Sequence, residues 1–547
     1  MKNREALIRE CEPVENCIAR IKQYKLADNL YQLLDEAARD APDTLAWCFF
    51  DSGERVTYRD LRTQVNQLAA GLYAAGIGPG THVGVMAPNI AAFPLTWLAL
   101  ARLGAVMVPI NTRYTARELH YVMTDSETRH LVIHPDTFNV LQEAQQAYPD
   151  LALESVITIS SERWDGFFVD KGPAQTLTTA GPCPAPGPDT LLNIQYTSGT
   201  TGFPKGCMLP HQYWLVAGLS HAFCDGQRYQ RILISLPFFY MTAQWQFVMA
   251  LYQRATSYVA ARQSATRFMS WVREYEIDFC IIPTLAYKQP EQDADANNII
   301  KRANIYGFPK GNHADLERRF DVIAREGYGM TEIGAGMFMP MRATDTVGSG
   351  SCGIPMPHRE FRIVDENGKD VPRGEVGELI VRGAGIMQGY YRKPEAMAAS
   401  YYGEWFRTGD LFKQDARGYY YIVGRTKDMI RRSGENIAAR EIEGVLLEVP
   451  QIEEAAVVPV PDELRGEEVK AFLVLRPGVC PDDIPPQAVV DHCLARLAVF
   501  KVPRYIAYRS APLPKTPSGK ISKPELIAET TDLRHDSWDR IDGRWHR

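Results

Sequence analysis

Residues 196–206 form a loop rich in glycine, serine and threonine that directly follows a short apolar run. The loop reads Tyr-Thr-Ser-Gly-Thr-Thr-Gly-Phe-Pro-Lys-Gly and carries one lysine, Lys205. Backbone N–H groups, hydroxyls and a lysine charge at short range suit a phosphate group. It is not a Walker loop, because Pro204 precedes Lys205 and Gly206 follows it. The composition therefore predicts a phosphate-binding loop of another type, with an ordinary glycine-rich linker as the alternative.

Four further side chains could act on a nucleotide. Asp410 offers two oxygens to the hydroxyls of a ribose, and Arg425 offers a fork of donors. Glu332 is a hard oxygen ligand of the kind that Mg²⁺ uses beside phosphate oxygens. Tyr328 offers a flat face for adenine. Each has a bland alternative as a turn residue, a surface charge, a helix cap or a core tyrosine.

The elements that must position these residues follow from the apolar pattern. Between residue 29 and residue 150, apolar runs alternate with amphipathic segments, which predicts parallel βαβ units. We expect helices at 29–40, 61–75 and 89–103, and strands at 44–50, 82–86 and 104–109. Short β runs at 361–364, 378–381 and 419–423 predict a small β-rich subdomain, and later strands are expected at 455–460 and 470–475.

Length and composition limit the classes of protein. A chain of 547 residues exceeds one hydrophobic core, and its net charge of −6 gives no support for nucleic-acid binding. The apolar stretch 91–110 is interrupted by proline, arginine and glycine, so it reads as a buried helix and strand and not as a membrane span. A charged N-terminus predicts no signal peptide. The ten scattered cysteines predict free thiols in the cytoplasm.

With these residues in view, the sequence resembles the adenylate-forming superfamily, which includes acyl-CoA synthetases, firefly luciferase and the adenylation domains of peptide synthetases. The resemblance covers residues 30–525. Its motifs, in the family's order, are the loop 196–206, Tyr328-Gly-Met-Thr-Glu332, Trp405-Phe-Arg-Thr-Gly-Asp410 with Gly424-Arg425-Thr-Lys427-Asp428, Ser433-Gly434-Glu435-Asn436, and Pro514-Lys-Thr-Pro-Ser-Gly-Lys520.

The resemblance implies a fold. We expect an α/β protein with a large N-terminal domain of βαβ-type subdomains plus a small β-rich subdomain. A small mobile α+β C-terminal domain, carrying the catalytic lysine, is expected to follow. The change to a more charged texture places the boundary near residue 426, giving domains at 1–426 and 427–547. The polar residues 530–547 are expected to be loosely ordered.

It also implies the roles of individual residues. The catalytic residues would be Lys520, Glu332, Thr331 and Lys205, with Glu332 as the metal ligand and Lys427 as the hinge of a domain rotation. Cofactor binding would fall to Thr197, Ser198, Gly199, Thr200, Thr201, Gly202, Gly307, Phe308, Pro309, Tyr328, Gly329, Asp410, Arg425, Gly434 and Glu435. The acid pocket would contain Phe239, Tyr240, Trp245, Met330 and Gly334.

The reaction implied is an ATP- and Mg²⁺-dependent ligation. A carboxylate attacks the α-phosphorus of ATP, pyrophosphate leaves, and a thiol then attacks the acyl-AMP. Only 27 residues follow Lys520 and no Gly-Gly-x-Ser signature appears, so free coenzyme A is the expected acceptor. Lys501, Arg504 and the segment 434–436 resemble parts that face CoA in acyl-CoA synthetases. The expected partners are an acid, ATP and CoA, with no nucleic acid and no integral membrane segment.

The motifs do not identify the acid substrate, and the predicted pocket residues must be considered. Tyr240 stands where many members have a gating histidine, and Phe308 where alanine or glutamate often precedes proline. Bulky aromatic walls favour a short or medium acid, including functionalised ones, over a long fatty acid. Local segments such as Val108-Pro-Ile-Asn111 resemble crotonobetaine/carnitine-CoA ligases. An aromatic acid–CoA ligase and a non-catalytic nucleotide-binding homologue remain the alternatives.

Overall fold

The structure, a computed structural model, describes residues 4–159, 185–197, 204–432, 435–516 and 520–546. The chain forms two compact units. Unit 1 comprises residues 1–197, 203–360 and 381–404, and unit 2 comprises residues 198–202, 361–380 and 405–547. The boundary expected near residue 426 lies inside unit 2, so that boundary stays a prediction.

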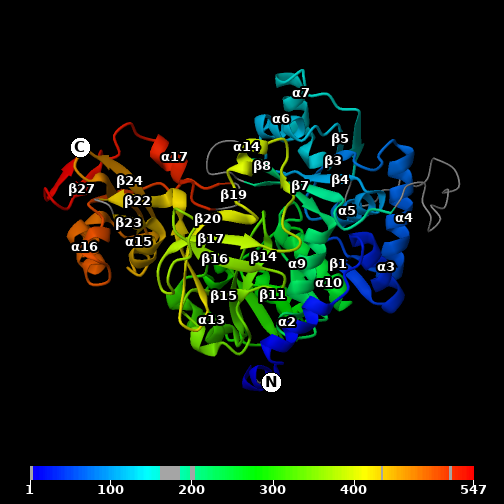
Figure 1. Cartoon of the computed structure of the whole chain (residues 1–547), viewed down its shortest axis with the longest axis horizontal. Coiled ribbons are helices and arrows are strands. Elements are labelled where there is room, and N and C mark those ends of the chain that lie inside the picture. Colours follow the sequence, from blue (N-terminus) through cyan, green and yellow to red (C-terminus); the bar gives the residue numbers. More distant parts are fainter. Residues whose placement is uncertain (1–3, 160–184, 198–203, 433–434, 517–519, 547) are drawn as a thin grey trace. The chain divides into compact units, whose positions relative to one another are not determined.

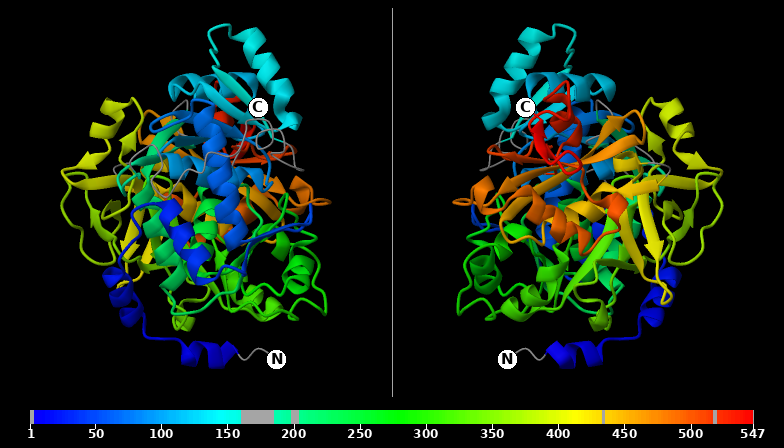
Figure 2. Two further views of the ribbon diagram at one scale, coloured as in Figure 1. Left: turned by 90° about the vertical axis from the view of Figure 1, so that its right-hand side faces the viewer. Right: turned by 90° about the vertical axis from the view of Figure 1, so that its left-hand side faces the viewer.

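Unit 1 contains most of the helices and two sheets (Figures 1 and 2). Its helices are α1 (Arg4–Glu10), α2 (Val14–Gln23), α3 (Leu30–Asp40), α4 (Tyr58–Ala74), α5 (Ala92–Leu103), α6 (Ala116–Asp125), α7 (Phe138–Ala147), α9 (His211–Phe223), α10 (Met241–Gln253), α11 (Phe268–Glu274), α12 (Thr284–Tyr287), α13 (His313–Phe320) and α14 (Pro394–Ala398), with 3-10 turns η1 (Pro135–Thr137), η2 (Lys310–Asn312) and η3 (Thr344–Thr346). Its strands are β1 (Leu45–Phe49), β2 (Glu54–Thr57), β3 (His82–Met86), β4 (Val106–Pro109), β5 (His130–Ile133), β6 (Ser155–Thr158), β7 (Leu191–Thr197), β8 (Lys205–Pro210), β9 (Arg231–Ile234), β10 (Thr256–Val259), β11 (Phe279–Ile281), β12 (Arg302–Ile305), β13 (Ala324–Met330), β14 (Gly334–Phe338), β15 (Ser351–Pro355), β18 (Gly389–Tyr390) and β19 (Tyr401–Tyr402).

The first sheet has the order β18-β8-β7-β4-β3-β5-β6. Strands β7, β4, β3, β5 and β6 run parallel to one another, which confirms the βαβ prediction for this part of the chain. The strand expected at 82–86 is β3, and the apolar stretch 91–110 forms the buried helix α5 and strand β4. Among the described residues, no helix is both long and apolar enough to cross a membrane.

A second sheet of unit 1 contains the order β15-β14-β13-β12-β11-β9-β10-β1-β2. Strands β13, β12, β11, β9, β10 and β1 are parallel, whereas β14 folds back antiparallel on β13. Helices α9 and α10 pack against each other, and both are buried over most of their length. Buried residues lie on all sides of both helices, as expected for helices in the interior of a large unit.

Unit 2 contains the predicted β-rich part and an α+β part with its own apolar core. Its elements are β16 (Glu360–Val364), β17 (Gly377–Arg382, whose last two residues belong to unit 1), β20 (Trp405–Gln414), β21 (Tyr420–Arg425), η4 (Thr426–Asp428), β22 (Met429–Arg432), β23 (Glu435–Ala438), α15 (Ala439–Leu446), β24 (Ile452–Asp462), β25 (Gly466–Leu475), η5 (Pro481–Asp483), α16 (Pro486–Leu494), η6 (Val499–Lys501), β26 (Tyr505–Arg509), α17 (Lys523–Ala528), β27 (Ser537–Asp539) and β28 (Arg544–His546). The mixture of helices and sheets confirms the predicted fold class.

The end of the chain corrects one expectation. Residues 530–547 were expected to be loosely ordered, but β27 and β28 form a hairpin that extends the sheet beyond β26. The buried Lys470 ammonium donates to the backbone oxygens of Leu533 (2.7 Å) and His535 (3.1 Å). A polar composition hid these long-range contacts, because the partners of the tail lie far away in the sequence.

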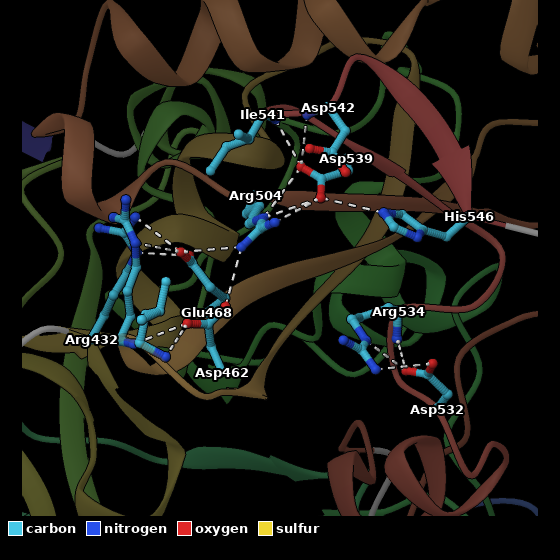
Figure 3. Close-up of polar contacts among 12 residues, drawn as sticks. Arg432, Asp462, Glu468, Arg504, Asp532, Arg534, Asp539, Ile541, Asp542 and His546 are labelled. Atoms are coloured by element: carbon cyan, nitrogen blue, oxygen red, sulfur yellow. Dashed lines mark hydrogen bonds and ion pairs between the residues drawn. The ribbon is translucent and has the colours of Figure 1, made fainter.

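Ion pairs anchor the same hairpin (Figure 3). The guanidinium of Arg504 lies 3.0 Å from Asp539, 3.2 Å from Asp462 and 3.8 Å from Glu468. Glu468 also pairs with Arg432 at 2.7 Å. Asp539 is fully buried. A buried carboxylate is tolerated only when it is paired and hydrogen-bonded, so Arg504 is what allows the hairpin to bury Asp539.

We expect Asp539→Ala to destabilise the C-terminal hairpin by roughly 2–4 kcal/mol. Removing the carboxylate breaks a buried pair and leaves its buried hydrogen-bond donors without an acceptor, although Arg504 keeps its other two carboxylates. Amide hydrogen exchange of residues 505–546 measures the effect. The exposed Asp542 of the same hairpin provides the control, and Asp542→Ala is expected to change stability by less than about 0.5 kcal/mol. Equal protection in both variants would show that the pair is dispensable.

Candidate functional site

The predicted phosphate loop connects two antiparallel strands. Thr197 ends β7 and Lys205 begins β8, and the two residues face each other in the register. The predicted contacts of residues 198–202 lie outside the described residues. Gly206 lets the strands pack closely, since a Cβ there would lie 2.6 Å from the side chain of Ile194. The apolar β7 thus fixes one end of the loop, and β8 presents Lys205 at the other.

A narrow hairpin carries Glu332. Thr331 and Glu332 lie in the turn between β13 and β14. A Cβ at Gly329 would lie 2.6 Å from the backbone oxygen of Gly334, so only glycine permits this approach. Gly334 itself has φ +67°, which glycine adopts without strain. The glycines that the family motif supplies therefore have a local purpose: they narrow the hairpin that presents Glu332.

One tyrosine joins these two hairpins. The hydroxyl of Tyr390 donates to Oε1 of Glu332 at 3.0 Å, and the Nζ of Lys205 lies 4.6 Å from the centre of the Tyr390 ring. Burial raises the pKa of Tyr390, and the nearby Glu332 charge acts in the same direction. Tyr390 therefore stays protonated and remains a donor. Sequence reasoning missed Tyr390, because a tyrosine in a Gly-Tyr-Tyr string carries no chemical signal by itself.

The segment around Tyr240 is fixed by buried amides. The side chain of Gln195, on β7, donates to the backbone oxygen of Phe239 at 2.7 Å. The amide of Asn111 donates to the hydroxyl of Tyr240 at 3.3 Å. Burial raises the pKa of Tyr240, while Arg113 and the Asn111 hydrogen bond lower it in part. The ring at this predicted gate position is therefore held from a neighbouring strand end and stays neutral.

Trp245 lies in the interior of unit 1. Its side chain is 4% exposed and stacks on the His221 ring, with centroids 3.8 Å apart and an interplanar angle of 16°. Burial lowers the pKa of His221 to about 3, and Arg302 adds to that effect. The imidazole is therefore neutral. This pair fills space between α9 and α10, and its place in an acid pocket stays a prediction.

The segment at 307–309 places its aromatic ring in the core. Phe308 is buried and packs edge-on against Tyr287, at 5.2 Å between centroids. Its backbone N–H donates to Glu326 at 3.1 Å. The Phe308 ring packs in a core cluster, and its expected place in the nucleotide site or the wall of the acid pocket stays a prediction. Gly307 adopts φ +62°, and Pro309 precedes η2.

Strand β13 also carries two predicted site residues, Tyr328, expected near the adenine, and Met330, expected in the acid pocket. Tyr328 is buried, and its hydroxyl donates to the sulfur of Met330 at 3.6 Å. Both side chains come from the strand that ends in the Glu332 turn. Their binding roles remain predictions.

In unit 2 the structure brings Asp410 and Arg425 together. They face each other on β20 and β21, and Arg425 Nε lies 3.0 Å from Asp410 Oδ1. The part of β20 before Asp410 is held by Glu378, which accepts from the backbone N–H of Gly409 at 3.2 Å and pairs with Arg407 at 2.7 Å. Sequence reasoning missed Glu378. The paired side chains form one polar edge suited to a ribose.

The predicted catalytic lysine closes a turn. The backbone N–H of Thr516 donates to the backbone oxygen of Lys520 at 2.7 Å, and Lys520 is exposed. Residues 517–519 lie outside the described part of the chain. Nearby in sequence, Lys523 pairs with Glu443 at 2.7 Å, which fixes the start of α17. Lys520 is thus exposed close to an anchored helix, and its catalytic role stays a prediction.

The other predicted residues of unit 2 are placed by their backbone. Lys427 lies in the 3-10 turn η4, Glu435 begins β23, and Gly434 lies outside the described residues. Lys501 pairs with Glu441 at 2.8 Å. Arg504 is held by the carboxylates of Figure 3. Both basic residues that resemble CoA-facing positions are therefore already neutralised within unit 2.

Comparison with known proteins decides the family. The model of the AMP-binding enzyme family matches residues 34–391, and the model of the AMP-binding enzyme C-terminal domain matches residues 441–520. The chain belongs to the AMP-binding enzyme family. The predicted superfamily and the enzyme class, acid–thiol ligase, are thereby confirmed.

Similar proteins of this family are CoA ligases. A sulfoacetate–CoA ligase of Cupriavidus necator is 33% identical, over 91% of this chain and 97% of that protein. A crotonobetaine/carnitine–CoA ligase of Salmonella agona is 31% identical, over 91% of this chain and 98% of that protein. A solved Mycobacterium tuberculosis fatty acyl CoA synthetase is 28% identical with a TM-score of 0.71, covering 92% of this chain and 98% of that one. The local likeness to the crotonobetaine/carnitine branch thus extends over most of the chain.

Proposed function

We propose that this AMP-binding enzyme joins a carboxylic acid to coenzyme A with ATP as the energy source. The observation that carries the proposal is the meeting of Lys205 and Glu332 around Tyr390, at the end of the predicted phosphate loop. A cation and a hard oxygen ligand in one place suit ATP bound with Mg²⁺. The proposed donor fits the metal, because the Glu332 carboxylate in the β13–β14 turn offers hard oxygen of the kind that Mg²⁺ binds.

The chemistry needs no protein nucleophile. A carboxylate oxygen of the acid attacks the α-phosphorus of ATP, pyrophosphate leaves, and an acyl-AMP forms. Mg²⁺, when bound, neutralises charge on the phosphate oxygens. Lys205 and Lys520 supply positive charge where the phosphoryl oxygens gain negative charge, and Asp410 with Arg425 holds the ribose. The thiol of CoA then attacks the acyl carbonyl, and AMP leaves with the former carboxylate oxygen.

For the acid we propose a short or medium chain, including functionalised acids. The bulky aromatic residues predicted for the pocket wall, Phe239, Tyr240 and Trp245, would narrow the site, and Phe308 is expected to add to this. Two similar proteins, a sulfoacetate–CoA ligase and a crotonobetaine/carnitine–CoA ligase, are named for small polar acids. Long-chain acids remain candidates because a similar solved structure is a fatty acyl CoA synthetase. Aromatic acids remain candidates as the predicted alternative.

The cellular setting remains a proposal as well. All nine described cysteines are free thiols, and all except Cys480 are buried. Free thiols are typical of a reducing cytoplasm, which is the location we propose.

Pyrophosphate release measured with ATP, Mg²⁺ and a panel of acids tests the function. The panel contains sulfoacetate, crotonobetaine, short and long fatty acids, and anthranilate as an aromatic acid, each with and without CoA. We expect release with a small acid, and formation of the thioester and AMP only when CoA is present. A non-catalytic homologue would give no turnover with any acid.

The first prediction concerns Lys520. Lys520→Ala is expected to slow formation of acyl-AMP by about 10²–10³-fold, because one preorganised donor to a developing charge is lost. Transfer from pre-made acyl-AMP to CoA should remain largely intact. Rapid-quench measurement of the two half-reactions decides the matter. The neighbouring Lys523→Ala is the control for structural damage, since Lys523 pairs with Glu443; equal losses in both half-reactions of Lys520→Ala would mean a structural role.

The second prediction concerns the size of the acid. Trp245→Ala should move the preference of the enzyme toward larger acids. One methylene in an apolar pocket is worth about 1–3 kcal/mol, so a change of rank is expected and not an absolute switch. The variant also removes the His221 stack and should lower the melting temperature. Trp245→Phe, which leaves a smaller hole, keeps the test open if Trp245→Ala does not fold. An unchanged ranking in a folded variant contradicts the assignment.

The third prediction concerns the boundary between residues 1–426 and 427–547. We propose that the C-terminal part rotates between the half-reactions about Lys427, so that Lys520 can give way to CoA. A hinge needs freedom of φ and ψ, and proline fixes φ near −65°. Lys427→Pro should preserve adenylation and block thioester formation. Lys427→Ala, which keeps the freedom of the backbone, should support both steps. Parallel losses of both half-reactions in the proline variant would rule out a hinge here.

A further inference from the structure

The hydrogen bond between Tyr390 and Glu332 lies at the meeting point of three chain segments. Tyr390 belongs to β18, which pairs with β8 so that Tyr390 faces Cys207, two residues after Lys205. The backbone N–H of Met387 donates to the backbone oxygen of Glu332 at 2.9 Å. The Glu332 residue is thus bound to the 387–390 segment through both its main chain and its carboxylate.

A buried arginine holds the same two segments together. Arg359 is 6% exposed and donates to the backbone oxygen of Ile333 twice, at 2.7 and 3.1 Å. It also donates to the backbone oxygens of Gly385 (3.0 Å), His358 (3.1 Å) and Ala384. Ile333 follows Glu332 directly, and residues 384–385 lead into the strand of Tyr390. One guanidinium therefore connects the turn of Glu332 with the loop that brings Tyr390 to it.

Burial of Arg359 disfavours the charged form of its guanidinium. Burial lowers the pKa of Arg359 to about 10. The contacts above satisfy the guanidinium with main-chain oxygens, which carry only partial charges. Such an arrangement costs free energy unless every donor is used. In Arg359 all five N–H groups donate to main-chain oxygens, and the same hydrogen bonds fix the geometry of the two segments.

We propose that Tyr390 is a positioning residue that orients the Glu332 carboxylate beside Lys205, and that Arg359 fixes the backbone geometry that makes this contact. The inference rests on the proposed function, in which Glu332 binds Mg²⁺. A hydroxyl that donates to one carboxylate oxygen sets the direction of the other. Residues that hold metal ligands in this way typically change metal affinity by about 10–100-fold when they are replaced.

Tyr390→Phe removes the hydroxyl and keeps the ring beside Lys205. We expect the half-saturating Mg²⁺ concentration for pyrophosphate release to rise about 10-fold, with little change in melting temperature. Binding of Mn²⁺ in the presence of a non-hydrolysable α,β-methylene analogue of ATP, followed by EPR, should weaken by the same factor. Tyr391→Phe is the matched control, because the neighbouring Tyr391 hydroxyl donates to the exposed Glu127. It should leave both values unchanged.

Arg359→Lys tests the second half of the inference. A lysine has three donors and no planar fork, so it cannot reach all of these oxygens. We expect a lower melting temperature together with the same shift in Mn²⁺ binding. Arg319→Lys is the control, since Arg319 is also buried and donates to the backbone oxygens of Tyr287, Gln289 and Pro290. It should lower the melting temperature without changing Mn²⁺ binding.

Glu332→Gln separates failure of the inference from failure of the proposed function. No turnover of the unmodified enzyme with any acid would overturn the proposed function. If Glu332→Gln leaves Mn²⁺ binding unchanged, Glu332 is not the metal ligand and the inference falls with that role. If Glu332→Gln weakens Mn²⁺ binding but Tyr390→Phe does not, the function stands and the positioning role of Tyr390 is wrong. A shift in Tyr390→Phe alone, with Arg359→Lys unchanged, would overturn the part assigned to Arg359.

Discussion

The hydrogen bond from Tyr390 to Glu332 is the contact around which the site of unit 1 is organised. Charged groups stabilise developing charge best when they are held in place before the reaction, since then no reorganisation is needed. The glycines of the β13–β14 hairpin bring the turn close, and the Tyr390 strand pairs with β8 beside Lys205. Close packing of the hairpin, strand pairing and the Tyr390 hydroxyl thus all help to position Glu332 and Lys205.

In unit 2, charged side chains are instead buried in ion pairs that stabilise the unit. Its sheet is extended by a polar hairpin, and the carboxylate of Asp539 is buried there against Arg504. Glu468 is shared between Arg504 and Arg432, so no single pair carries the cluster (Figure 3). These arginines are used to hold the unit together. The positive charge that the proposed chemistry needs is then left to lysines such as Lys520, which lies exposed at a turn.

Much of the architecture could be predicted from the sequence, and the failures have a common cause. The strand at 82–86 and the buried helix at 92–103 follow from local apolar patterns, which the structure confirms. The motifs supplied Glu332 and Asp410, since those strings are long and ordered. Tyr390 was missed because its partners are remote in sequence. The terminal hairpin was mispredicted for the same reason, since Lys470, Arg504 and the strand β26 that hold it all lie far from it in the sequence.

The electrostatics of the predicted acid pocket narrow what it can recognise. His221 remains neutral at physiological pH, because burial lowers its pKa to about 3, so its stack with Trp245 offers no counter-charge. Near Tyr240 the situation differs: Arg113 acts against burial on the pKa of that hydroxyl, so a cation lies within electrostatic range. In the acid pocket that we propose, Arg113 on the Tyr240 side would favour a second negative charge on the acid, whereas the neutral His221–Trp245 side would favour an uncharged tail.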